Sequence, residues 1–272
     1  MELASHRRFD DMSGTVSDRQ RLSLMMNEAT RLVEEAKKRN VHLRVLGAIA
    51  FQFHCPKFNH LSLKLNRILT DIDFAGYSKE KDPMMSMMKE FGYADEPSVT
   101  ALFGHKRLIW DNKSNGVHVD IFLDMLEMNH DIPFKDRLGL DPLTIPLSDM
   151  LLEKMQIVQV NEKDYIDTMM LLREHAIGDN GNIPETIDAK YIAKLLASEW
   201  GFYYTVTTNL NKVQNRLAQY SDLSAEDRDD ITMKIGELLK RIEAEPKSFS
   251  WKMRAKVGTR NKWYRDVEEV VR

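Results

Sequence analysis

The chain has 272 residues, of which 43% are hydrophobic and 30% charged, as in an average folded globular protein. This composition excludes a mainly disordered, collagen-like or low-complexity chain, and the length suits one large domain or two ordinary ones. The 39 Lys and Arg residues against 42 Asp and Glu residues give a net charge of −3. Nucleic acid could therefore be attracted only by a local basic surface and not by the field of the whole protein.

The cysteine content and the apolar runs indicate a compartment. The single cysteine, Cys55, cannot form an internal disulfide, which is typical of a protein in a reducing environment. Residues 1–12 are charged and lack the apolar segment of a secretory signal. The most apolar early run, residues 45–51, is far shorter than the roughly 20 residues that span a bilayer. We expect a cytoplasmic protein with no membrane partner.

The first elements are read from apolar periodicity. Apolar residues recur every three or four positions over residues 16–39, which predicts an amphipathic helix. Alternation over residues 41–46 predicts a strand, and Gly47 then leads into a helix over residues 48–53. A polar stretch over residues 56–67 is typical of a loop.

A second group of strands is predicted further on. Residues 68–74 read as a strand, and residues 82–91 as a short helix whose methionines, Met84 to Met88, belong to the core. The apolar runs 104–110 and 117–123 flank a polar loop ending in Asn-Gly, which predicts a β-hairpin.

The pattern becomes helical after Pro146. Helices are expected over residues 150–158, 165–172, 188–198, 200–219 and 225–243. We therefore predict an α+β fold with two parts: residues 1–147, an α+β domain with an amino-terminal helix, and residues 148–272, a helical domain with a basic aromatic tail.

Three acids mark a candidate metal site. Asp71 and Asp73 are two positions apart on one predicted strand, so their side chains project to the same face. Asp120 lies on the return strand of the hairpin. Carboxylates crowded in this way repel each other unless a cation compensates, and Mg²⁺ or Mn²⁺ prefers such oxygen ligands. The alternative is that the acids sit at strand ends and face water.

The turn at Gly47-Ala48 is a candidate phosphate site. It joins a strand to a helix, where backbone N–H groups can receive phosphate and glycine permits close approach. A plain tight turn is the alternative.

These features together carry a family resemblance. The Gly47-Ala48 turn, the segment Arg67-Ile68-Leu69-Thr70-Asp71-Ile72-Asp73-Phe74 and the segment Val119-Asp120-Ile121-Phe122 resemble the nucleotidyltransferase superfamily. Residues 148–156 and 161–167 are similar to the lysine and K-D-x-x-D motifs of its AbiEii branch of toxin-type enzymes. The resemblance covers roughly residues 41–175. It implies a nucleotidyltransferase-type mixed sheet with flanking helices.

The resemblance also implies roles for individual residues. It makes Asp71, Asp73 and Asp120 the metal-binding catalytic acids and Lys154 a catalytic cation that reaches the triphosphate of a bound NTP. The residues that it places at the nucleotide are Gly47, Ala48, Arg67, Lys154, Asp164 and Asp167.

Some of these residues have structural alternatives. Lys154 could extend along a helix surface with its amine in water. Asp164 could cap the helix that begins after Asn161. Lys163, next to Asp164, is expected near the site.

The chain departs from the family pattern in two ways. The turn is usually Gly-Gly or Gly-Ser, whereas Ala48 offers no hydroxyl. The interval from Gly47 to Asp71 is longer than usual, which implies an insertion within residues 56–65. Both departures bear on nucleotide affinity more than on metal binding.

Two further groups have to be considered. His54, Cys55 and His60 match no zinc spacing, so a buried thiol beside loop histidines is preferred over a soft-metal site. Residues 247–272 carry eight basic and three acidic side chains together with four aromatic ones, Phe249, Trp251, Trp263 and Tyr264. Such a tail could contact phosphates and stack bases, or it could pack its aromatics on the helical domain.

The function expected from the resemblance is Mg²⁺-dependent transfer of a nucleoside monophosphate from an NTP to a hydroxyl. The expected acceptor is RNA, in particular a tRNA end, and an antitoxin protein is an expected partner. One alternative is a nucleotide-binding or interaction protein of the same fold without turnover. The other is an enzyme that modifies a small, antibiotic-like molecule.

Overall fold

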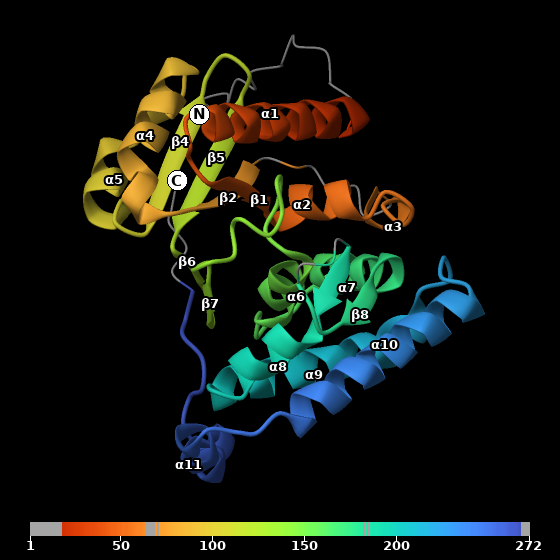
Figure 1. The fold of residues 1–272 in the computed structure, drawn as a ribbon. Coiled ribbons are helices and arrows are strands. Elements are labelled where there is room, and N and C mark those ends of the chain that lie inside the picture. The colour runs from red at the N-terminus through yellow and green to blue at the C-terminus, as the bar shows by residue number, and fades with distance from the viewer. Residues whose placement is uncertain (1–17, 64–68, 70, 182, 184, 268–272) are drawn as a thin grey trace, which may run out of the picture.

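A computed structural model of the chain describes residues 18–63, 69, 71–181, 183 and 185–267. These residues form a small mixed sheet with helices around it, followed by a region built mainly of helices (Figure 1). The expected α+β class is confirmed. Arg67, which the resemblance places at the nucleotide, lies outside the described residues, as do the first seventeen residues and the last five.

The chain begins as the periodicity predicts. The first elements are α1 (Asp18–Lys38), β1 (Leu43–Leu46), α2 (Gly47–His54), α3 (His60–Leu63) and β2 (Asp71–Gly76). The predicted loop after α2 therefore contains one short helical turn, and β2 begins and ends slightly later than the apolar run suggested.

The hairpin and its neighbours follow. They are η1 (Ser78–Glu80), α4 (Lys81–Glu90), β3 (Ala94–Asp95), α5 (Pro97–Phe103), β4 (Arg107–Asn112) and β5 (Val117–Leu123). The hairpin prediction is confirmed, since β4 and β5 pair antiparallel. Helix α5 was not predicted. It has proline in its first turn, where the missing N–H costs no hydrogen bond.

The sheet brings distant segments together. Its strand order is β1-β2-β5-β4-β3, and β2 pairs with β5 in parallel although two strands and two helices separate them in sequence. The other neighbours are antiparallel. In the parallel pair Asp73 lies opposite Asp120, so the register itself places two of the candidate acids side by side.

The remaining elements are mostly helical. They are β6 (Met125–Glu127), β7 (Asp131–Pro133), α6 (Leu147–Met155), α7 (Glu162–Glu174), β8 (Ala176–Gly178), β9 (Thr186–Asp188), α8 (Ala189–Leu196), α9 (Trp200–Arg216), η2 (Leu217–Gln219), α10 (Ala225–Ala244), α11 (Phe249–Val257) and η3 (Gly258–Arg260). The five predicted helices of this half are confirmed. None of the helices in the described ranges is long and apolar enough to cross a membrane.

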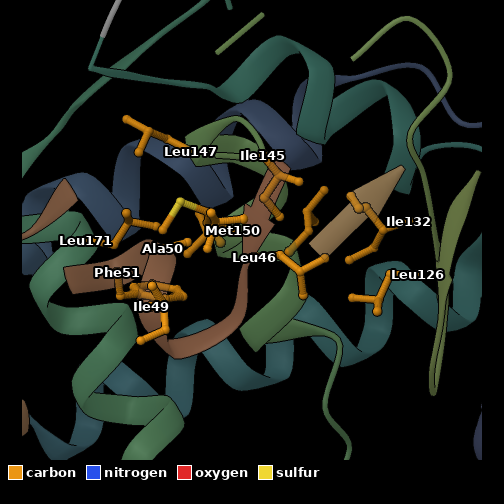
Figure 2. Packing of buried hydrophobic residues seen from close by; sticks show 14 of the residues in the cluster. Leu46, Ile49, Ala50, Phe51, Leu126, Ile132, Ile145, Leu147, Met150 and Leu171 are labelled. Carbon is orange, nitrogen blue, oxygen red and sulfur yellow. The ribbon is translucent and has the colours of Figure 1, made fainter. Parts of the chain in front are cut away.

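Apolar packing joins the sheet part to the helical part. One cluster of buried residues extends from α1 to α10. Figure 2 shows its centre, where Ile49 and Phe51 of α2 lie near Met150 of α6 and Leu171 of α7. Burial of these side chains stabilises the fold by roughly 1.5 to 3 kcal/mol each. Helix α2, which follows the Gly47 turn, is therefore held by both parts.

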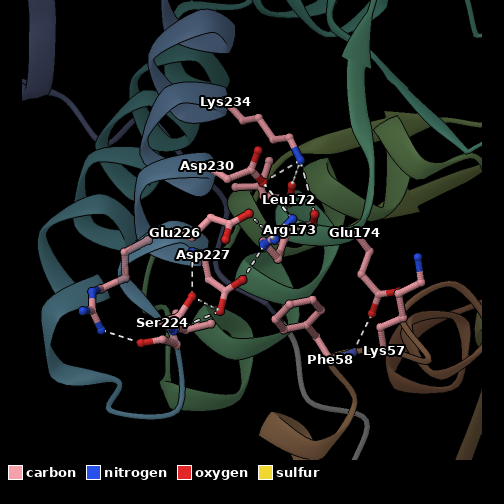
Figure 3. A network of polar contacts seen from close by, with 12 residues as sticks. Lys57, Phe58, Leu172, Arg173, Glu174, Ser224, Glu226, Asp227, Asp230 and Lys234 are labelled. Carbon is pink, nitrogen blue, oxygen red and sulfur yellow. Dashed lines mark hydrogen bonds and ion pairs between the residues drawn. The ribbon is translucent and has the colours of Figure 1, made fainter.

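Polar contacts secure the end of α7 (Figure 3). Arg173 donates to Asp227 of α10 at 2.6 Å, and the Lys234 amine donates to the Leu172 carbonyl at 2.8 Å. On the other side, Glu174 accepts from the Phe58 N–H at 2.7 Å. The last turn of α7 is thus tied to α10 and to the segment after α2.

A buried ion pair joins the β7–α6 connection to α6. The Arg137 guanidinium donates through Nε to both oxygens of Asp149, at 2.9 and 2.7 Å, and lies 3.4 Å from the Tyr191 ring centroid. Asp149 is 0% exposed, and burial raises its pKa against the opposing effect of Arg137.

We predict that Arg137→Met destabilises the protein by about 3 to 5 kcal/mol, because it leaves a buried carboxylate without its cation. Urea unfolding measures the change. Lys38→Met is the control, since it breaks the solvent-exposed Lys38–Glu35 pair and should leave stability almost unchanged. Equal losses for the two variants would contradict the assignment.

Candidate metal and nucleotide site

The three acids converge at one end of the sheet. Asp71 and Asp73 lie on β2 and Asp120 lies on β5, and one oxygen from each carboxylate is within 4.8 Å of the others. This is the grouping that strand parity predicts. Asp120 is 2% exposed, whereas Asp71 and Asp73 keep some surface toward solvent.

The Gly47 turn closes over Asp73. Gly47 has φ of +69°, and a Cβ placed on it would lie 2.5 Å from Asp73 Oδ2. Both facts require glycine, because other residues adopt this conformation at a cost and any side chain would displace the carboxylate. Glycine at this turn therefore allows the Asp73 carboxylate to approach the backbone closely, which is a role additional to the phosphate contact expected from the sequence.

Two charged residues that the sequence did not single out complete the group. Arg107 of β4 donates through Nη2 to Asp120 Oδ2 at 2.7 Å. Glu153 of α6 accepts from the Gly47 N–H at 3.1 Å through Oε2. The available signals were weak: Arg107 is a basic residue at the start of an apolar hairpin strand, and Glu153 directly precedes Lys154.

The charges around Asp73 do not balance. Burial raises the pKa of Asp73 well above its usual range, and the neighbouring carboxylates of Asp71, Asp120 and Glu153 raise it further, while Arg107 opposes them. Burial also raises the pKa of Glu153. The site therefore favours bound protons or a bound cation, and three converging carboxylates are a donor set that suits Mg²⁺ or Mn²⁺.

Lys154 points inward. Its side chain is 7% exposed, and its amine lies 3.0 Å from Asp167, 3.5 Å from Asp164 and 3.9 Å from Glu153. The surface alternative for Lys154 is therefore wrong. The capping alternative for Asp164 is confirmed, because Asp164 and Asn161 form a reciprocal capping box at the start of α7. Asp164 thus caps α7 and also contacts Lys154.

A polar cavity of about 230 Å³ connects these groups. It is lined by residues from the turn, from the acidic strand and from the two helices of the lysine motifs: Leu46, Gly47, Ala48, Ile49, Leu69, Asp71, Asp73, Glu153, Lys154 and Lys163. Lys154 and Lys163 thus line the same space as two of the three acids. Asp164 and Asp167 are not among the residues that line the cavity, but both contact the Lys154 amine.

The basic aromatic tail packs largely on α9. Trp263 donates to Thr205 at 3.1 Å and meets the Tyr204 ring edge-on, while Arg254 stacks 4.8 Å over Trp200. A Cβ on Gly201 would lie 2.3 Å from the Trp263 carbonyl oxygen, so the tail lies directly against the helix. This arrangement is the packing alternative for these aromatics. Lys252, Lys256 and Phe249 remain exposed.

No family model, curated protein or solved structure matches the chain. The functional argument therefore depends on the geometry and charge of the site and on the motif resemblance.

We predict that Asp73→Asn raises stability at neutral pH without metal, because it removes a carboxylate whose charged form is disfavoured by burial and by the neighbouring carboxylates. The folded wild type binds the Asp73 proton more tightly than the unfolded chain does. This tighter proton binding contributes fully to stability below the ordinary Asp73 pKa near 3.8. The contribution is lost as the pH rises through the raised pKa of Asp73 in the folded protein.

Urea unfolding between pH 4 and pH 8 checks this prediction, with Mg²⁺ as a second variable. Mg²⁺ should stabilise the wild type but not Asp73→Asn. Asp229→Asn, an exposed acid on α10, should behave as wild type. Identical pH dependence for all three proteins would refute the raised pKa.

We also predict that Gly47→Ala costs more than Gly258→Ala. Both glycines have positive φ, +69° and +62°, so both variants place alanine in a backbone conformation that L residues rarely adopt. Only Gly47 has Asp73 in the way, since a Cβ on Gly258 meets nothing within 4 Å. Thermal unfolding with and without Mg²⁺ should show an additional loss and a reduced Mg²⁺ response for Gly47→Ala alone. Equal effects would mean that the approach to Asp73 is unimportant.

Proposed function

We propose that the protein is a divalent-cation-dependent nucleotidyltransferase. The observation that carries this proposal is the convergence of Asp71, Asp73 and Asp120 beside a cavity that two lysines also line. Three carboxylates favour a cation, and the exposed Lys163 favours an anion, whereas Lys154 is already paired with Asp164 and Asp167. A nucleoside triphosphate with its metal is a substrate that satisfies both.

The sheet supports the same proposal at the level of fold. The glycine turn that leads from β1 into α2, the strand β2 with two acids and its neighbour β5 with the third acid are the features that carry the family resemblance. The nucleotidyltransferase fold is on this basis part of the proposal.

Each residue has a chemical role in this mechanism. Bound Mg²⁺ would neutralise phosphate charge and lower the pKa of the acceptor hydroxyl. Asp71 and Asp73 would hold the cation, and Asp120, which accepts a hydrogen bond from Arg107, would add the third ligand. Lys154 and Lys163, which line the cavity, would contact the phosphates. The acceptor oxygen forms a bond to the α-phosphorus, the bond to the β-phosphate oxygen breaks, pyrophosphate leaves, and a carboxylate of the cluster takes the hydroxyl proton.

A second candidate function rests on Glu153. Its carboxylate accepts the Gly47 N–H, the group that a phosphate at the turn would use. Triphosphate binding there requires Glu153 to move or to be protonated. This contact favours the alternative of a nucleotide-binding or interaction protein with little turnover.

The acceptor is proposed from charge alone. An RNA such as a tRNA end would use a local basic surface, and Lys252 and Lys256 on α11 are exposed. A small-molecule hydroxyl is the other acceptor consistent with the site. A protein antitoxin as partner follows from the family resemblance, and a cytoplasmic location follows from the cysteine content; both remain predictions.

The test is transfer of label from each α-³²P-labelled NTP, with Mg²⁺, to the RNA, protein and small-molecule fractions of a bacterial extract. We expect labelled RNA with the wild type and with Asp229→Asn, and none with Asp73→Asn or Asp120→Asn. Labelling that survives both of these substitutions would refute the proposed site.

Glu153→Gln separates the two candidate functions. Removal of its charge should tighten NTP binding by about tenfold, the value of one hydrogen bond to a charged group. If the wild type binds NTP but transfers nothing, and Glu153→Gln transfers nothing either, the function without turnover is the correct one.

A further inference from the structure

A second cluster lies at the opposite end of α2 from the acidic site. His54 ends α2, His175 follows α7, and Glu185 precedes β9. One ligand atom from each of the three lies within 4.8 Å of the others. Glu185 Oε2 is 3.1 Å from His175 Nδ1 and 3.4 Å from His54 Nδ1. The members are up to 131 positions apart in sequence, so no local sequence motif predicts the cluster.

Hydrogen bonds at the far side of each ring fix the neutral tautomers. His175 Nε2 lies 3.0 Å from the His54 carbonyl, which can only accept, so the proton is on Nε2. His54 Nε2 lies 2.7 Å from the Thr144 hydroxyl. That hydroxyl donates its one proton to the Ile145 carbonyl at 2.8 Å, so it accepts from His54. Both Nδ1 atoms are therefore unprotonated in the neutral rings, and each lies within 3.4 Å of the Glu185 carboxylate.

Such a group is unfavourable without a cation. Two lone pairs and a negative charge are held together, and His175 is 3% exposed. His175 Nδ1 is buried and makes no hydrogen bond to any residue that the structure describes.

The spacing matches tetrahedral zinc. Zn–N and Zn–O bonds of about 2.0 to 2.1 Å place tetrahedral ligand atoms about 3.3 Å apart. The observed 3.1 and 3.4 Å bracket that value. Two imidazoles and one carboxylate favour Zn²⁺ over Mg²⁺, and a hydrogen-bond acceptor behind each imidazole is typical of metal-binding histidines.

We propose that His54, His175 and Glu185 form a Zn²⁺ site with one open coordination position. The Glu185 side chain is 59% exposed, so solvent can reach that position. This site is separate from the acidic triad. The expectation that His54, Cys55 and His60 form no soft-metal site is unaffected, because only His54 belongs to the new cluster.

The site would brace the helices that frame the cavity. Helix α2 begins at Gly47 and ends at His54, and α7 carries Asp164 and Asp167 before it ends at His175. The contacts of Arg173 and Glu174 already hold the end of α7 (Figure 3). Bound Zn²⁺ would therefore link two elements that are already fixed nearby and would need little rearrangement of the chain.

The test is Zn²⁺ titration of the whole chain against a chromophoric chelator, at neutral pH and with excess Mg²⁺ to occupy the acidic triad. We expect one Zn²⁺ per chain and a Zn²⁺-dependent rise in Tm. Thr144→Val removes only the hydrogen-bond partner of a ligand and should weaken Zn²⁺ binding by about 10- to 100-fold. His54→Ala and Glu185→Gln change the ligands themselves, so each should weaken binding by more than about 100-fold.

Matched controls make the result specific. His60→Ala removes an exposed histidine of the neighbouring α3 and should bind Zn²⁺ as the wild type does. Asp73→Asn should also bind normally, which separates this proposal from the proposed function. Absence of stoichiometric Zn²⁺ binding, or equal affinity in wild type and Glu185→Gln, would overturn the proposal and leave an imidazolium–carboxylate cluster. Because Glu185 is exposed, Glu185→Gln should fold even if a His175 variant does not.

Discussion

Crowding of carboxylates around Asp73 is the constraint on which the rest of the site depends. Asp71 and Asp120 lie within ligand-sharing distance, and Glu153 approaches through the Gly47 turn. Two unit charges 4.8 Å apart repel by about 3.5 kcal/mol at an effective dielectric constant of 20. Arg107 offsets part of this repulsion through Asp120. A cation bound among these carboxylates would offset further repulsion between them. The arrangement therefore favours metal binding.

The fold keeps this crowding in place from several directions. The parallel pairing of β2 with β5 fixes Asp73 opposite Asp120, and the left-handed conformation of Gly47 gives Asp73 room. Helix α2 cannot shift freely, because its apolar side chains are packed between α6 and α7. The acids therefore have no easy way to relax apart. Lys154, paired with Asp167 and Asp164 on α7, fixes the opposite wall of the cavity.

Local patterns in the sequence were enough to predict the longer helices, the hairpin and the three acids of the site, but not α3, α5, α11 or the short strands. Period-two spacing placed Asp71 and Asp73 on one face, and the Asn-Gly loop placed Asp120 on a hairpin strand. The partners Arg107 and Glu153 could not be predicted in the same way. Arg107 reaches Asp120 because of hairpin register, and Glu153 reaches Gly47 across 106 positions of sequence. The pairing of β2 with β5 in parallel is likewise a property of the whole sheet.

The histidine cluster shows the same limit more sharply. His54 was considered only with its sequence neighbours Cys55 and His60, whereas its partners in space are His175 and Glu185. Thr144, which fixes its tautomer, comes from the connection before α6. Spacing rules detect metal sites built within one segment, whereas the three members of this cluster come from three segments and Thr144 comes from a fourth.

The most direct test of the central claim is anomalous diffraction from crystals soaked in Mn²⁺, which replaces Mg²⁺ at oxygen sites and can be located by its own signal. We expect an anomalous peak among the carboxylates of Asp71, Asp73 and Asp120, with metal–oxygen distances of about 2.1 Å. A structure in which Mn²⁺ binds elsewhere, while these carboxylates remain without a metal peak, would contradict the proposed metal site.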